Sequence, residues 1–152
     1  MRTAIAAVAS LCLLGAFPAA RAAAADAKPE AAGAEKPGKA QLQKSYSKTV
    51  RRHVAEASRK SGAFVVHDDK LDKDWRLKLV RIHTDRIVQL ADDTFFACAD
   101  LKEPEGKKTK LDLDFYVVRK GGDWVMDKVL VHKVAGKPRY TYNDKNEMVP
   151  VP

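Results

Sequence analysis

The pattern of apolar and polar positions changes once along the chain, from a helical period to a strand-like alternation. Between residues 41 and 61, apolar side chains recur every three or four positions, which predicts one amphipathic helix. The stripe consists of Leu42, Tyr46, Val50, His53, Val54 and Ala57. Gly62 follows this stretch and suits the C-terminal cap of a helix, and the basic residues before it suit the helix dipole.

Beyond Gly62 the apolar positions follow a period of two, which predicts antiparallel strands. The clearest segment is LDLDFYVVR, in which Leu111, Leu113 and Phe115 share one face. The glycines of KGGD predict a hairpin after it, because such turns need positive φ angles. The other strand-like segments are AFVVHD, WRLKLVRIH, DRIVQLA, TFFACADL, WVMDKVLVHKV and RYTYN. In WRLKLVRIH, Val80 and Ile82 make the second half apolar on both faces.

This order predicts a single α+β domain over residues 41–142. One N-terminal amphipathic helix would pack on a curved antiparallel sheet of four to six strands. The element order resembles the cystatin-like and nuclear-transport-factor-2-like folds, in which a curved sheet wraps a helix. Such folds occur in enzymes, inhibitors and binding modules, so the resemblance implies a fold and leaves the activity open.

The first 25 residues have the pattern of a secretory signal peptide. Arg2 precedes an apolar run at 4–17 that is too short to span a membrane, and alanine-rich sequence follows. We expect cleavage between Ala22 and Asp26, with an uncleaved signal anchor as the alternative. The mature protein would then be periplasmic or secreted, without a transmembrane segment.

The segments that flank the domain are expected to lack a packed core. Residues 26–40 are rich in Ala, Pro, Gly, Lys and Glu, which predicts a flexible linker, and residues 143–152 predict a C-terminal tail. No Gly-rich phosphate-binding motif is present, and ATP and nicotinamide cofactors are not generally available outside the cytoplasm. We therefore expect no cofactor, and kinases, GTPases and dehydrogenases are disfavoured.

The chain carries 28 basic and 20 acidic residues, for a net charge of +8. A positive field favours anionic lipid, lipopolysaccharide, an acidic protein or nucleic acid. Because the two signs alternate along most of the chain, a solvated surface is the ordinary explanation. An exported protein rarely meets nucleic acid, so we do not expect that partner.

Cys98 is the only cysteine that remains after the predicted leader, which contains Cys12. Leu11 stands where a lipidation site needs a small residue, so Cys12 is not expected to carry a lipid. In TFFACADL, Cys98 and Phe96 share one face, opposite a wholly apolar face that should be the core. Cys98 is then either a hidden structural thiol or a redox, nucleophilic or disulfide-forming group.

Basic and aromatic residues gather near the C-terminal end and predict a partner-binding strip. The strip consists of His132, Lys133, Arg139, Tyr140 and Tyr142. A closing strand that packs its tyrosines on the core is the alternative.

A polar pocket between helix and sheet is a second candidate site, with His83 and the pair Asp112 and Asp114 as acid–base groups. The ordinary alternative is that both carboxylates form the polar half of an alternating strand and pair with Lys78 or Lys128. The histidines lack the short spacings of metal sites, so no metal is predicted, and the sequence His67 to Asp69 indicates an acidic turn.

The favoured function is a small exported, non-enzymatic binding or accessory protein of the cell envelope that acts through its sheet surface. Its partner would be a protein or a small ligand, and the oligomeric state stays open. The alternatives are a small enzyme with a His/Asp pocket and a binder of anionic lipid or glycan.

Overall fold

The computed structural model describes residues 37–90, 93–105 and 109–151. The predicted signal peptide at 1–25, and most of the predicted linker, lie outside these residues. The elements run in the order α1 (Lys39–Ser58), β1 (Phe64–Asp68), β2 (Lys73–Ile82), the 3₁₀ turn η1 (Thr84–Arg86), β3 (Val88–Gln89), β4 (Thr94–Lys102), β5 (Lys110–Lys120), β6 (Asp123–Val134), β7 (Lys137–Pro138), β8 (Tyr140–Tyr142) and β9 (Met148–Pro150).

The predicted helix is confirmed as α1, whose buried face includes Tyr46, Val50 and Val54. It ends at Ser58, before the predicted boundary. The N–H group of Gly62 donates a 2.8 Å hydrogen bond to the carbonyl of Ser58, and Gly62 has a φ angle of +72°. This left-handed conformation suits glycine and closes the helix.

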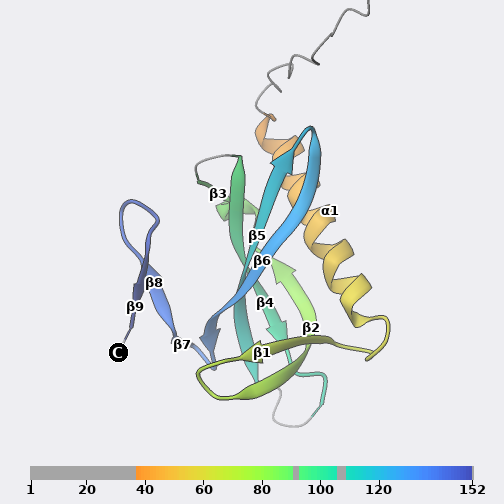
Figure 1. Ribbon diagram of the computed structural model, residues 1–152, viewed down its shortest axis with the longest axis vertical. Helices are drawn as coiled ribbons and strands as arrows, with labels where there is room; N and C mark the ends of the chain where they lie inside the picture. The colour runs from red at the N-terminus through yellow and green to blue at the C-terminus, as the bar shows by residue number, and fades with distance from the viewer. Residues whose placement is uncertain (1–36, 91–92, 106–108, 152) are drawn as a thin grey trace, which may run out of the picture. The chain divides into compact units, whose positions relative to one another are not determined.

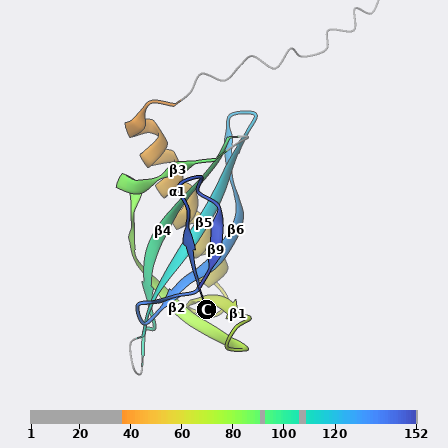
Figure 2. The ribbon, with the colours of Figure 1, turned by 90° about the vertical axis from the view of Figure 1, so that its left-hand side faces the viewer.

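The α+β class is also confirmed, with more strands than predicted. The main sheet is antiparallel in the order β1-β2-β4-β5-β6-β7, and β3 pairs with β4 outside this path. Strand β3 lies within the predicted segment DRIVQLA, whereas β7 was not predicted; each is only two residues long. The predicted hairpin joins β5 to β6 through Gly121 and Gly122, both with positive φ. The sheet is strongly curled (Figures 1 and 2).

Helix α1 packs on one face of the sheet, here called the inner face, and forms the main core with it (Figure 1). The alternate residues of β4 and β5 that face it are Phe95, Ala97, Ala99, Leu101, Leu111, Leu113, Phe115 and Val117. The hydroxyl of Tyr46 donates a 2.6 Å hydrogen bond to the carbonyl of Phe115 and accepts one of 2.8 Å from the N–H of Ala97. The helix is thus tied to the two central strands by polar contacts as well as by apolar packing.

A β-bulge explains the irregular apolar pattern of β2. Trp75 and Leu77 are buried, and the register against β4 then shifts between Leu79 and Arg81. The shift leaves Val80 exposed and returns Ile82 to the core. An extra residue in one strand changes which side chains face inward, so apolar residues on both sides of the alternation are accommodated.

The C-terminal residues differ from the prediction. Residues 143–152 were expected as a tail, but Met148–Pro150 pairs with Tyr140–Tyr142 to form the separate β8–β9 hairpin. The turn is stabilised by Asn143, whose side-chain oxygen accepts hydrogen bonds from the N–H groups of Lys145 and Glu147. The hairpin lies across the sheet from α1, on the face here called the outer face (Figures 1 and 2).

Candidate functional site

The central strands bring three polar side chains together on the outer face. Cys98 of β4 and Asp114 of β5 are direct cross-strand partners. His132 of β6 completes the group, and the ligand atoms of the three residues all lie within 4.8 Å of one another. We call these residues the Cys98–Asp114–His132 cluster.

A bulge in β6 shapes this part of the outer face. The register between β5 and β6 passes from Leu113 opposite Val131 to Asp112 opposite Lys133, so His132 is the extra residue. As a result the neighbours His132 and Lys133 both contact acidic residues of β5. The first lies 3.5 Å from Asp114 and the second 3.1 Å from Asp112. Bulges often re-aim side chains in this way beside functional sites.

The carboxylate of Asp114 is the hub of the cluster. It is only 1% exposed. Its Oδ2 atom accepts hydrogen bonds from the hydroxyls of Tyr142 at 2.6 Å and Tyr140 at 2.9 Å. Its Oδ1 atom lies 3.5 Å from Nδ1 of His132, which in turn lies 3.3 Å from Sγ of Cys98. A buried charge needs such partners, because desolvation without them is costly.

The environment moves the pKa values of the cluster in opposite directions. Burial alone would raise the pKa of Asp114, but the hydrogen bonds from His132, Cys98 and Tyr142 outweigh it and hold the pKa below its usual value. Burial, followed by the negative charge of Asp114, raises the pKa of the Cys98 thiol far above its usual range. Without a bound cation, Cys98 is therefore a protonated thiol and a poor nucleophile.

A cavity of about 390 Å³ lies over the cluster. A histidine–carboxylate contact and an ion pair border it: His83 Nε2 lies 2.9 Å from Asp100 Oδ1, and Lys133 pairs with Asp112. Its lining residues are His83, Arg86, Val88, Phe96, Ala97, Cys98, Asp100, Asp112, Asp114, His132, Lys133, Tyr142 and Asn146. The cavity is thus shared between the outer face and the hairpin, and we call it the outer-face pocket.

Aromatic rings pack the hairpin onto the outer face. The ring of Tyr142 lies 4.8 Å from that of Phe96, and the ring of Tyr140 stacks on His132 at 4.9 Å between centroids. The hydroxyls of Tyr142 and Tyr116 are 2.8 Å apart. Since Tyr142 uses its hydrogen on Asp114, Tyr116 is the donor in this contact. The rings form a small second core opposite the helix.

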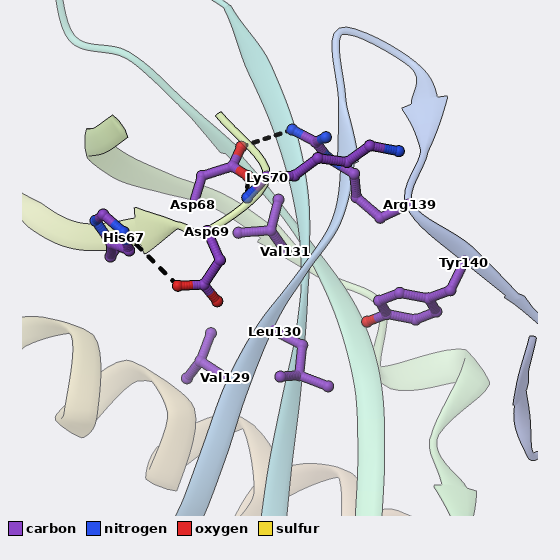
Figure 3. Close-up of a pocket in the computed structure, with 9 residues that line it drawn as sticks. All are labelled: His67, Asp68, Asp69, Lys70, Val129, Leu130, Val131, Arg139 and Tyr140. Atoms are coloured by element: carbon purple, nitrogen blue, oxygen red, sulfur yellow. Dashed lines mark hydrogen bonds and ion pairs between the residues drawn. The ribbon is translucent and has the colours of Figure 1, made fainter. Parts of the chain in front are cut away.

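An ion pair anchors the start of the hairpin to the end of β1. The guanidinium of Arg139 donates a 2.7 Å hydrogen bond to Oδ2 of Asp68 (Figure 3). The indole N–H of Trp75 donates to the same oxygen at 3.0 Å. A smaller cavity of about 240 Å³ lies between Arg139, Tyr140 and β1 (Figure 3). Arg139 and Tyr140 are therefore engaged with the protein's own acidic residues.

In the structure, residues of the predicted partner-binding strip make contacts within the protein. Its residues do lie close together, but Arg139 binds Asp68, and Tyr140 and Tyr142 bind Asp114. These contacts hold the segment against the domain itself, and binding of a partner through the strip stays a prediction. Tyr140 and Tyr142 contact the outer face because they lie on the separate β8–β9 hairpin.

The location predicted for the polar pocket is wrong. His83, Asp112 and Asp114 do line one pocket, but it lies on the outer face and not between helix and sheet. The inner layer is filled by the apolar half of β4 and β5, which leaves the polar half on the other side. Asp114 is buried there by the hairpin, and Asp112 pairs with Lys133 in place of Lys78 or Lys128.

Asp100 and Asp68 were not among the predicted site residues. Alternation in TFFACADL places Asp100 on the face of Cys98, so the sequence held a signal for it. The sequence around Asp68 contains no pattern that marks it as a site residue, because its partner Arg139 is distant in sequence and comes close only in the folded protein. His67 forms the expected acidic turn, with Nδ1 2.9 Å from Asp74, and His53 packs edge-on against Phe64.

Within the described residues, no helix combines the length and apolar character needed to cross a membrane. Comparison of the chain with models of known protein families, with curated proteins and with solved structures finds no match.

Proposed function

We propose that this protein is an exported binding module that receives a small ligand in the outer-face pocket. The observation that carries the proposal is the convergence of the Cys98–Asp114–His132 cluster, the His83–Asp100 contact and the Lys133–Asp112 ion pair on one cavity of about 390 Å³. Binding sites are concave and hold a few well-placed polar groups, and this cavity has both features. The sheet surface is then the functional surface, as the sequence led us to expect.

Nucleophilic catalysis by Cys98 is not favoured by the geometry. In a catalytic triad, the acid binds one ring nitrogen of histidine and the nucleophile approaches the other. Here Asp114 and Cys98 both lie closest to Nδ1 of His132. The raised pKa of the thiol also opposes formation of the thiolate.

Export is the second part of the proposal and is supported by the leader alone. Cleavage between Ala22 and Asp26 would leave the predicted linker, up to the start of α1 at Lys39, ahead of the domain. The mass of the protein recovered from the cell envelope tests this point directly. A mass that still includes residues 1–25 would contradict cleavage.

Native mass spectrometry of the protein from its own compartment tests the ligand. We expect a non-covalent adduct that a V88W substitution removes, because Val88 lines the pocket and the larger ring fills it. The matched control is V125W, at a position on β6 that is 46% exposed and outside this pocket. No organic adduct on the unsubstituted protein, or an organic adduct that V88W retains, would contradict an organic ligand in this pocket.

One observation favours an enzyme as the second candidate function. His83 and Asp100 form a 2.9 Å pair on the same pocket, an arrangement in which a carboxylate orients a general base. Under this alternative, the species bound in the pocket would be converted, and an H83Q variant would bind it without turnover. Recovery of the adduct chemically unchanged after incubation would favour the binding module.

A further inference from the structure

We propose that Cys98, Asp114 and His132 bind a divalent transition-metal ion of the zinc class, with a fourth position open to the outer-face pocket. The inference rests on the proposed function, because it names the class of ligand that the same pocket takes. It assigns a role to the thiol that a purely structural cysteine would not have.

The spacing of the ligand atoms fits tetrahedral coordination. Zinc bond lengths of about 2.3 Å to sulfur and about 2.0 to 2.2 Å to nitrogen and oxygen place neighbouring ligand atoms about 3.3 to 3.6 Å apart. In the structure, Sγ of Cys98 and Nδ1 of His132 are 3.3 Å apart. Nδ1 of His132 and Oδ1 of Asp114 are 3.5 Å apart. All three ligand atoms lie within 4.8 Å of one another, which is compatible with an ion at the centre of the group.

The donor set selects the class of ion. A soft thiolate, an imidazole and a hard carboxylate together suit zinc, which is a borderline ion, whereas magnesium and calcium prefer oxygen alone. Binding of the ion replaces the thiol proton of Cys98, which leaves to solvent. The bound cation also reverses the local electrostatics, since its positive charge stabilises the thiolate that Asp114 otherwise opposes.

The surroundings of the cluster already hold its ligands in place. Tyr140 and Tyr142 occupy Oδ2 of Asp114, which leaves Oδ1 facing His132. The ring of Tyr140 stacks on His132 with an interplanar angle of 14° and fixes its orientation. Outer contacts of this kind orient metal ligands and are a regular part of metal sites.

Three protein ligands leave one tetrahedral position for an exchangeable group. Closed sites with four protein ligands are structural, whereas three-ligand sites keep a position for water or a substrate. Because all three ligands line the outer-face pocket, that position opens into it. The arrangement suits reversible capture of the ion, or capture of a small molecule through it.

Calorimetric titration of the reduced, chelator-treated full-length protein with zinc chloride tests the inference. We expect one ion per chain, with affinity lowered more than about 100-fold in H132Q and C98S, because loss of a ligand exceeds the 10- to 100-fold cost of losing an outer contact. The matched control is H67Q, since His67 also lies near carboxylates, those of three exposed aspartates, but is not part of the cluster. Its affinity should equal that of the unsubstituted protein.

Cobalt binding to the unsubstituted protein keeps the test independent of whether the variants fold. A bound thiolate gives a thiolate-to-cobalt charge-transfer band, which we expect on addition of cobalt chloride. Absence of zinc binding, absence of this band, or loss of binding in H67Q but not in H132Q would overturn the inference. If zinc does not bind but V88W still removes an organic adduct, the metal site is contradicted and the proposed ligand pocket is supported. If the protein as isolated carries no adduct but zinc binds through Cys98, the metal site stands on its own.

Discussion

The hydroxyl of Tyr142 donates a 2.6 Å hydrogen bond to the buried carboxylate of Asp114, and this contact joins the C-terminal hairpin to the sheet. The two residues come from elements that share no backbone ladder. The hairpin's position over the pocket therefore depends on side-chain contacts together with the backbone hydrogen bond from the N–H of Arg139 to the carbonyl of His132. These contacts also place the tyrosine ring against the outer face, where it lines the pocket.

Substitution Y142F is expected to lower the free energy of unfolding by about 1.5 to 3 kcal/mol, the range for a hydrogen bond to a charged group. The ring and its packing on Phe96 remain, so the loss reports the hydroxyl alone. Urea unfolding measures the change. T141A on the exposed side of the same strand is the control and should change stability by less than about 0.5 kcal/mol. Equal effects of both substitutions would contradict the role given to the hydroxyl.

The ion pair between Asp68 and Arg139 predicts a specific pH dependence of stability. Burial alone would raise the pKa of Asp68, but the hydrogen bond from Trp75 and the charge of Arg139 outweigh it and hold the pKa below its usual value. A depressed folded-state pKa gives stability that is present above the unfolded pKa, about 3.9, and is lost as the pH falls through the folded value.

The stability advantage of the unsubstituted protein over D68N should therefore be largest at neutral pH and should shrink as the pH falls below about 4. Urea unfolding between neutral and strongly acidic pH measures both proteins. The exposed neighbour Asp69 supplies the control D69N, whose difference from the unsubstituted protein should stay small throughout. An advantage over D68N that is constant or grows on acidification would contradict the ion pair.

Substitution Y46F removes a hydroxyl that binds the backbone of both central strands. It leaves the N–H of Ala97 without this partner in the core, and we expect a loss of about 1 to 3 kcal/mol in the free energy of unfolding. Because Tyr46 lies on the inner face, zinc affinity of the folded protein should stay unchanged. A stability change under about 0.5 kcal/mol, or a loss of zinc affinity, would show that this contact was misjudged.

Local patterns predicted the inner layer well. The helical period of α1 and the alternation in LDLDFYVVR both arise because one face of each element is buried. A buried face is visible directly in the order of apolar and polar residues along the chain. The alternation in TFFACADL likewise placed Cys98 away from the main core. The bulge at Val80 is what the mixed pattern of WRLKLVRIH had concealed.

The outer face could not be predicted in the same way. The sequence could not show that β8 and β9 form their own ribbon, because a short YTY segment has the same pattern in a sheet or in a hairpin. That ribbon decides the burial of Asp114 and the engagement of Arg139. The metal ligands lie on three different strands, so the short spacings that reveal many metal sites are absent.

X-ray absorption at the zinc edge of the loaded protein reports the atoms bound to the ion and so tests the metal site itself. We expect one sulfur ligand at about 2.3 Å and nitrogen or oxygen ligands at about 2.0 to 2.2 Å, with the sulfur lost in C98S. A coordination shell of nitrogen and oxygen alone in the unsubstituted protein would show that Cys98 is not a ligand and would contradict the proposed site.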